Sequence, residues 1–312
     1  MDLIPQSGPH LHILLNHFPS VGLVIALGFY ITAFITRSDV MKRSCLVLFV
    51  ILGILGIPTY ISGAASMWVL STVPEIPQGM INAHRDMALL AFIGLGITGS
   101  GAWLVLWQAR HVGRLSNRAL YAVLTLAIIT LGLMTETGHL GGQINHPEIQ
   151  SAAEILAADQ NVGRTIGIER IMGGDWIFVS METLHFFGMA FIFGTVLIVT
   201  LRVLGLGKSV PFSTVHRLLP LGFLGLMINT VSGMLLFIGD SGRYVAMDLF
   251  PAKMALLVIG AIAVLYFSLF ERVWNVKAGE DAPITAKAVA AVTLLAWAGV
   301  IALGRFLPYM EG

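Results

Sequence analysis

The sequence predicts an all-α, polytopic membrane protein whose eight transmembrane helices form two tandem four-helix repeats. Hydrophobic residues make up 56% of the 312 residues and charged residues only 11%, which is typical of a chain that lies mostly in lipid. Eight apolar stretches reach the length of about 20 residues that a membrane span requires. In addition, motifs of the first half return in the second half in the same order.

The predicted spans end at polar or basic loops. They cover approximately residues 13–36, 45–70, 86–107, 119–138, 177–201, 217–238, 249–270 and 286–306. Twelve of the eighteen Lys and Arg residues fall in the loops of one side and six on the other. Because cytoplasmic loops are enriched in Lys and Arg, we expect the first side to be cytoplasmic and both termini to lie outside.

The internal repeat rests on several short matches at similar spacing. The matched segments are 17–18 with 185–186, 52–56 with 221–225, 62–63 with 232–233, 87–90 with 254–257, and 138–139 with 304–305. We therefore predict a first repeat at 1–142, an outer-side loop at 143–176 and a second repeat at 177–312, related by an axis along the membrane normal. On this alignment His17 and His185 are symmetry mates, whereas Arg305 replaces His139.

Four histidines lie near the outer ends of four separate spans: His17, His84, His139 and His185. Neutral imidazole is a good axial ligand for haem iron, and helical bundles commonly hold such cofactors between their helices. The single cysteine, Cys45, excludes a C-x-x-C-H attachment motif and a four-cysteine cluster. The pattern therefore predicts one or two non-covalent b-type haems, with these histidines as candidate iron ligands.

Charged residues near the same ends are candidates for contacts to the cofactor. Arg85, Lys253 and Arg305 are positioned to pair with haem propionates, or else to extend toward the interface. Glu136 and Glu182 lie within a turn of candidate histidines. Either carboxylate is a candidate to accept a proton from a quinol or to hold the second nitrogen of a ligand histidine.

The remaining outer-side histidines are predicted to be loop residues. These are His10, His12 and His146, and a separate copper or zinc site among them is left open. The long loop contains a predicted interfacial amphipathic helix at Ile149–Ala158, preceded by Pro147. This loop is either a docking surface for an outer-side protein or a lid over the bundle.

The histidine motifs also carry a resemblance to known families. The segment His17-Phe18-Pro19, the histidine His84 and the segment Gly138-His139-Leu140-Gly141-Gly142 resemble a family of four-helix bacterial membrane domains of uncharacterised function. The second half resembles another such family, through His185, Lys253 and the dipeptide Gly304-Arg305, among others. The arrangement is also loosely similar to membrane cytochrome b subunits, although it lacks their histidine pairs at both faces. The resemblance implies a multi-pass protein of the bacterial inner (cytoplasmic) membrane.

The leading functional hypothesis is a b-type haem subunit of an electron-transfer complex. It would pass electrons between a quinone and an outer-side redox protein such as a c-type cytochrome, without carrying them across the membrane. A cofactor-free membrane anchor for an outer-side enzyme and a transporter are the alternatives. Membrane lipid is an expected partner, and the formal net charge of +1 argues against nucleic acid.

Overall fold

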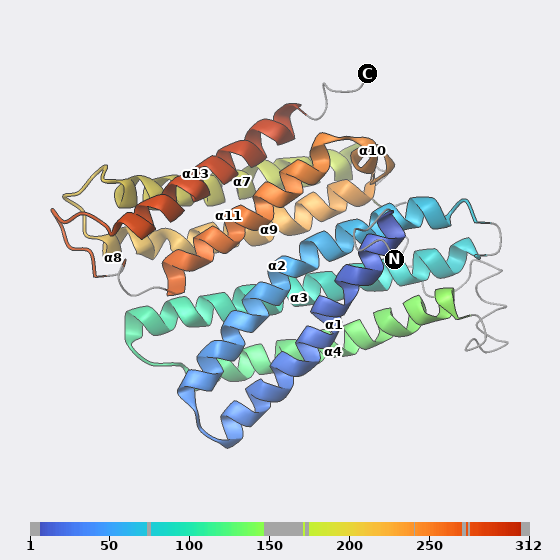
Figure 1. Ribbon diagram of the computed structural model, residues 1–312, viewed down its shortest axis with the longest axis horizontal. Helices are drawn as coiled ribbons and strands as arrows, with labels where there is room; N and C mark the ends of the chain where they lie inside the picture. Colours follow the sequence, from blue (N-terminus) through green and yellow to red (C-terminus); the bar gives the residue numbers. More distant parts are fainter. Residues whose placement is uncertain are drawn as a thin grey trace. The chain divides into compact units, whose positions relative to one another are not determined.

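The computed structural model describes residues 7–73, 76–146, 171, 175–239, 241–269, 273 and 275–306. Within these ranges the chain forms helices and no strand (Figure 1). The spanning segments are α1 (Gly8–Ile35), α2 (Asp39–Leu70), α3 (Gln78–Val112), α4 (Asn117–Asn145), α7 (Asp175–Leu204), α8 (Phe212–Val215) continued by η2 (His216–Leu218) and α9 (Leu219–Gly239), α11 (Leu249–Leu269) and α13 (Ile284–Phe306). These eight segments are long and apolar enough to cross a membrane, so the predicted fold class of a multi-pass helical membrane protein is confirmed.

The first helix begins at Gly8, earlier than the sequence predicted. Ser7 caps it, because its side chain accepts a hydrogen bond from the backbone N–H of His10 at 3.4 Å. Pro9 occupies the first turn, where its missing N–H has no partner to lose. His10 and His12 therefore lie on a helix, and the prediction that they are loop residues is wrong.

The helices divide into two compact units, unit 1 (1–174) and unit 2 (175–312). Helix α4 continues to Asn145 and α7 begins at Asp175, so most of the predicted outer loop falls between these two helices. The amphipathic helix predicted at 149–158 lies outside the described residues. Each unit is described by itself below.

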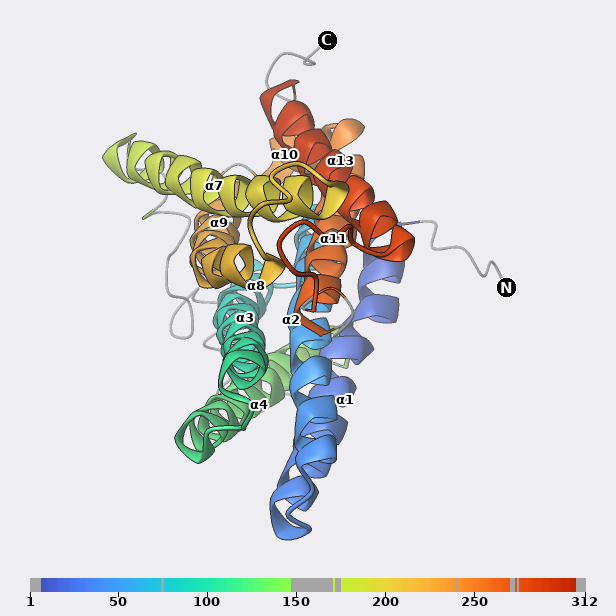
Figure 2. The same ribbon diagram turned by 90° about the vertical axis from the view of Figure 1, so that its left-hand side faces the viewer.

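Unit 1 is a closed four-helix bundle. Each helix packs against its neighbours in sequence, and α4 returns to pack against α1 (Figure 1, Figure 2). Helices α1 and α3 are therefore diagonal partners across the core. A methyl group added at Gly99 would lie 2.9 Å from the carbonyl oxygen of Phe49, so glycine is what allows α2 and α3 to approach so closely.

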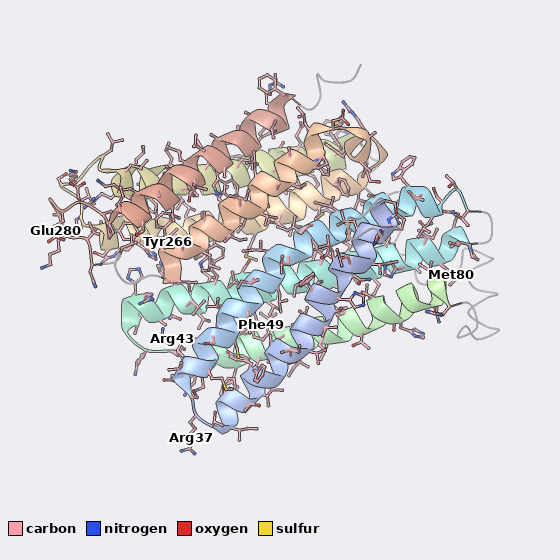
Figure 3. The ribbon with its side chains drawn as sticks, in the orientation of Figure 1. Arg37, Arg43, Phe49, Met80, Tyr266 and Glu280 are labelled. Atoms are coloured by element: carbon pink, nitrogen blue, oxygen red, sulfur yellow. The ribbon has the colours of Figure 1, made fainter. Side chains whose placement is uncertain are left out.

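The two ends of unit 1 differ in chemistry. Arg37 and Arg43 lie at the end where α1 stops and α2 begins, whereas Met80 lies at the opposite end (Figure 3). Helices α1 and α3 begin at the Met80 end, and α2 and α4 stop there. We call this the histidine end of unit 1, because His12 and His84 lie within the first two turns of α1 and α3.

Unit 2 is built from α7, α9, α11 and α13. Helix α7 packs against both α9 and α13, and α11 packs against α13, so α7 and α11 both flank α13. Helices α7 and α9 approach closely, because a methyl group added at Gly225 would lie 2.7 Å from the carbonyl oxygen of Gly188. At the far end of α9, the ring of Phe237 stacks on that of Phe250 with a centroid distance of 5.3 Å.

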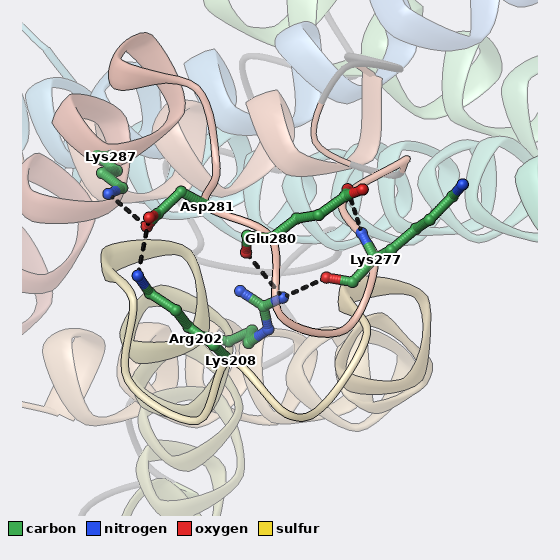
Figure 4. A network of polar contacts seen from close by, with 6 residues as sticks. All are labelled: Arg202, Lys208, Lys277, Glu280, Asp281 and Lys287. Atoms are coloured by element: carbon green, nitrogen blue, oxygen red, sulfur yellow. Dashed lines mark hydrogen bonds and ion pairs between the residues drawn. The ribbon is translucent and has the colours of Figure 1, made fainter.

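Two loops of unit 2 are joined at the end where α7 stops. The buried guanidinium of Arg202 donates to the carbonyl oxygens of Val210, Lys277 (3.0 Å) and Glu280 (3.4 Å), as Figure 4 shows for the last two. It thereby links the loop after α7 to the loop before α13.

The same two loops share an ion-pair cluster. The Asp281 carboxylate accepts from Lys208 and from Lys287, each at 2.8 Å (Figure 4). Hydrogen bonds from these two ammonium groups lower the pKa of Asp281 to about 2. The carboxylate therefore stays charged far below its ordinary range.

Candidate functional site

Two imidazole rings lie next to each other, in an edge-on arrangement, at the histidine end of unit 1. The ring centroids of His12 and His84 lie 6.4 Å apart, with their planes inclined at 75°. One ring comes from α1 and the other from α3, which are the diagonal pair of the bundle. The pair therefore meets in the interior of the bundle.

Both rings are held in the same tautomer. Nδ1 of His12 lies 3.1 Å from the carbonyl oxygen of Thr59, and Nδ1 of His84 lies 3.0 Å from that of Thr137. A carbonyl oxygen only accepts, so the ring proton belongs on Nδ1 in each case. Each Nε2 then presents a lone pair, and neither has a hydrogen-bond partner among the described residues. This is the arrangement in which a histidine is oriented for a metal.

A glycine lies against each ring. A methyl group added at Gly63 of α2 would lie 2.9 Å from Cε1 of His12. A methyl group added at Gly141 of α4 would lie 2.9 Å from Cε1 of His84. Each imidazole is thus wedged against the helix that follows its own, and any larger residue at either glycine would displace it.

A buried ion pair adjoins the histidine pair on α3. Nε and Nη2 of Arg85 donate to Oδ1 of Asp86 at 3.0 and 2.9 Å. The Asp86 side chain is 1% exposed, so its charge depends on this partner. Arg85, predicted as a propionate contact, is therefore already engaged by a neighbouring carboxylate.

The structure does not bring His17 into this cluster. Its ring lies on the exposed side of α1, and its Nδ1 bonds to the carbonyl oxygen of Ile13 at 2.7 Å. Five residues separate it from His12, which turns the side chain by about 140° around the helix. The two histidines therefore point to different surroundings.

His139 is also directed away from the pair. His84 contacts α4 at Thr137 and Gly141, which share one helix face, whereas a residue midway between them points to the other side. His139 is exposed and lies 3.0 Å from the side chain of Gln143, measured between Nε2 atoms.

The predicted carboxylates and Arg305 occupy varied positions. Glu136 is partly buried and directly precedes Thr137, whose carbonyl holds His84. Glu182 on α7 and Arg305 near the end of α13 are exposed. Their proposed roles toward a cofactor or a quinol stay predictions.

His185 in unit 2 makes a contact that parallels that of His12. Its Nδ1 lies 3.1 Å from Oγ of Ser232, and a methyl group added at Gly233 would lie 2.9 Å from its Cε1. His12 meets Ser62 and Gly63 in the same way, with Nδ1 to Oγ at 3.2 Å.

The register of this parallel differs from the predicted one. In unit 1 the Thr59 side chain donates to the carbonyl oxygen of Leu15, and in unit 2 the Asn229 side chain donates to that of His185. Leu15 is thus the positional counterpart of His185, and His12 lies one helical turn earlier. The predicted pairing of His17 with His185 is replaced by a shared role of His12 and His185.

Sequence reasoning did not include His12 among the candidate haem ligands. The signals that identify it are the cap at Ser7 and Pro9, which puts it on the helix, and its spacing from the buried residues Pro19, Ala26 and Ala33. These positions follow His12 at intervals of seven, so all lie on one face of α1.

In the described part of the chain, no group of three or more His, Cys, Asp or Glu side chains is placed to hold a metal ion. The fold and site together define a multi-pass helical membrane protein with a paired-imidazole site inside its first bundle. Comparisons of the chain with protein-family models, with curated proteins and with solved structures find no match.

Proposed function

We propose that unit 1 holds a b-type haem between His12 and His84, and that the protein is a membrane subunit that transfers electrons. The observation that supports this most directly is the pair of neighbouring imidazoles on diagonal helices. Bonds of about 2 Å from a metal to each imidazole nitrogen would put the two ring centroids about 6 Å apart. The centroids of His12 and His84 are 6.4 Å apart.

The number of ligands favours haem over a bare metal ion. A zinc ion in a protein usually takes four ligands, and the histidine end offers two neighbouring imidazoles. A porphyrin brings four nitrogens of its own, so that two axial side chains complete the shell of the iron. The described residues contain no group of three or more metal-binding side chains, so the two imidazoles suit an iron that needs only two ligands from the protein.

The protein's own contribution is to orient and insulate the two ligands. The carbonyls of Thr59 and Thr137 fix the tautomer, which leaves Nε2 as the ligand atom. Gly63 and Gly141 fix the position of each ring. A haem bound there supplies one-electron redox chemistry.

The partners follow from the position of the site. Both ligands lie within the first turns of membrane helices, close to one face. We propose that electrons pass between a membrane quinone and an outer-side redox protein such as a c-type cytochrome. Because the site lies at one end of the bundle, transfer by unit 1 stays on that side of the membrane. The bacterial inner membrane is the proposed location.

An optical spectrum tests the proposal. We expect the full chain, purified in detergent, to show a Soret band and a pyridine haemochrome typical of haem b. We expect His84→Ala to lose the six-coordinate spectrum of this haem, whereas His139→Ala on the neighbouring helix retains it. Well-folded wild-type protein without haem, combined with loss of complex assembly in His84→Ala, would favour the anchor function instead.

A further inference from the structure

Each histidine of the pair in unit 1 rests on a five-residue segment of the next helix. His12 lies against residues 59–63 of α2. The carbonyl oxygen of Thr59 is 3.1 Å from its Nδ1, and a methyl group added at Gly63 would lie 2.9 Å from Cε1 and 3.2 Å from Nδ1. We call such a segment a histidine cradle. Its first residue supplies the carbonyl acceptor, and its fifth residue is the glycine against the ring.

Residues 137–141 of α4 form the second cradle. The carbonyl oxygen of Thr137 is 3.0 Å from Nδ1 of His84, and a methyl group added at Gly141 would again lie 2.9 Å from Cε1 and 3.2 Å from Nδ1. The two imidazoles are therefore seated in the same way. Because a helix fixes its fourth residue relative to its first and fifth, the fourth residue of each cradle occupies the same place beside the ring.

The fourth residue is where the two cradles differ. It is Ser62 at the first cradle and the buried Leu140 at the second. Oγ of Ser62 lies 3.2 Å from Nδ1 of His12, and the hydroxyl donates its proton to the carbonyl oxygen of Thr59 at 2.8 Å. The oxygen of Ser62 therefore accepts from Nδ1–H, which is shared between two acceptors. A leucine side chain has no atom that can do the same for His84.

Unit 2 contains a cradle with serine at the fourth place. His185 lies against residues 229–233 of α9, where Oγ of Ser232 is 3.1 Å from its Nδ1 and a methyl group added at Gly233 would lie 2.9 Å from its Cε1. The Ser232 hydroxyl donates to the carbonyl oxygen of Ile228 at 2.6 Å, so its oxygen also accepts from the ring. The contact of a cradle serine with Nδ1 thus occurs in both units.

Lys253, predicted as a contact to haem propionates, is seated differently. It lies near the start of α11, and a methyl group added at Gly304 of α13 would lie 3.5 Å from both its Cε and its Nζ. The comparison of cradles therefore concerns the three histidines.

The acceptors of Nδ1–H affect how strongly Nε2 binds a metal. A hydrogen bond donated by the second nitrogen of a ligand histidine raises the basicity of the ring. Ferric iron carries one more positive charge than ferrous iron, so a more basic ligand stabilises the ferric form more. Additional hydrogen bonding at Nδ1 therefore lowers the reduction potential of a haem.

We propose that the fourth residue of each cradle sets the reduction potential of the haem in unit 1, and that Ser62 makes His12 the more basic of its two ligands. This inference rests on the proposed function of unit 1. Ser62 and Leu140 are positioning residues, because each acts through a ligand histidine. Since one cradle has the hydroxyl and the other lacks it, single substitutions can shift the potential in either direction.

The first experiment removes the hydroxyl beside His12. A redox titration of the full chain in detergent, followed by the haem spectrum, gives the midpoint potential. We expect Ser62→Ala to raise it and Ser62→Thr, which keeps the hydroxyl, to retain the wild-type value. Ser66→Ala is the matched control. The buried Ser66 lies one turn further along α2, and its hydroxyl donates to the carbonyl oxygen of Ser62 at 2.7 Å, so this variant loses a similar bond without changing the acceptors of Nδ1–H.

The second experiment adds a hydroxyl beside His84. Leu140→Ser places an acceptor at the fourth position of the second cradle, and we expect a lower midpoint potential than in Leu140→Ala. Both variants lose most of the same buried side chain, so their difference isolates the hydroxyl. A purely structural role of these positions does not produce shifts of opposite sign in Ser62→Ala and Leu140→Ser.

The outcomes separate this inference from the proposed function. Haem-loaded protein with equal midpoint potentials in Ser62→Ala and Ser66→Ala, and in Leu140→Ser and Leu140→Ala, overturns the role of the cradle and leaves the haem site. Folded wild-type protein that binds no haem overturns both. If Ser62→Ala does not fold, the two variants at Leu140 still decide.

Discussion

The contact between Gly141 and His84 gives a prediction whose size follows from the structure. In Gly141→Ala the new methyl group would lie 2.9 Å from Cε1 and 3.2 Å from Nδ1 of His84. The ring must move, and the Nδ1 hydrogen bond to Thr137 at 3.0 Å is weakened. Overpacking of this kind costs about 1–3 kcal/mol. Alanine in place of glycine in a helix returns about 0.5–1 kcal/mol.

Gly138→Ala on the same helix is the matched control. Among the described residues, apart from the adjoining backbone of α4 itself, nothing lies within 4 Å of a methyl group added there, so this variant gains the helix contribution without the clash. The difference between the two variants isolates the steric effect. We expect haem to bind Gly141→Ala roughly 5- to 150-fold more weakly than Gly138→Ala, which corresponds to about 1–3 kcal/mol.

Haem titration of the two variants in detergent, followed by the Soret band, measures the difference, and thermal unfolding shows whether both are folded. Equal haem affinity and an unchanged spectrum in Gly141→Ala and Gly138→Ala would refute the reasoning that His84 must keep its position to bind iron.

Three further predictions concern the fold. Gly225→Ala should destabilise the packing of α7 on α9 by about 1–3 kcal/mol, because its methyl group would lie 2.6 Å from the backbone nitrogen of Ile192. Gly194→Ala, where a methyl group meets open space, is the control. Thermal unfolding in detergent compares the two variants, and equal unfolding midpoints would contradict the close approach of the helices. Thr98→Val removes a buried 3.0 Å hydrogen bond to Thr130 and should lower stability by about 0.6 kcal/mol; an unchanged midpoint would show that the bond contributes nothing. Asp281→Asn removes the acceptor of two lysines. Because the pKa of Asp281 is about 2 in the folded chain, against an ordinary 3.8, its contribution is present above about pH 4 and lost as the pH falls through 2. The unfolding midpoints of wild-type protein and Asp281→Asn should therefore differ at pH 7 and converge near pH 2. A difference that stays constant with pH would show that the contribution of Asp281 to stability does not depend on its charge.

The positions of the membrane-spanning helices could be predicted from the sequence. Which side of each helix faces the core could not. Long apolar runs gave all eight spans, because lipid requires an apolar surface and internal hydrogen bonds along each one. The same requirement makes both the buried and the exposed sides of α1 apolar, as exposed Val24 and buried Leu23 show. Hydrophobic periodicity therefore does not show which side of such a helix faces the core.

This limit explains which histidines were identified. Distance along the chain gave the depth of His84 and His185 in their spans, and both are oriented by neighbouring helices. Depth alone also selected His17 and His139, whose side chains are exposed. His12 was not chosen as a candidate haem ligand, because the first span was predicted to begin at residue 13, whereas α1 begins at Gly8.

Two glycines of the predicted repeat, Gly63 and Gly233, have a structural role that the sequence did not show. Ser62-Gly63 and Ser232-Gly233 were recognised as matching segments of a repeat. In the structure each pair is the surface against which a histidine rests. Glycine is required there because the ring occupies the space of a side chain, which only the packing of two helices reveals.

The identity of the ligands in unit 1 is the central claim, and haem content in His12→Ala and His17→Ala tests it most directly. The two histidines lie five positions apart on the same helix, so that effects of folding and membrane insertion are closely matched. We expect His12→Ala to lose the low-spin haem of unit 1 and His17→Ala to retain the wild-type spectrum and haem-to-protein ratio. Loss of that haem in His17→Ala, with a wild-type spectrum in His12→Ala, would contradict the account.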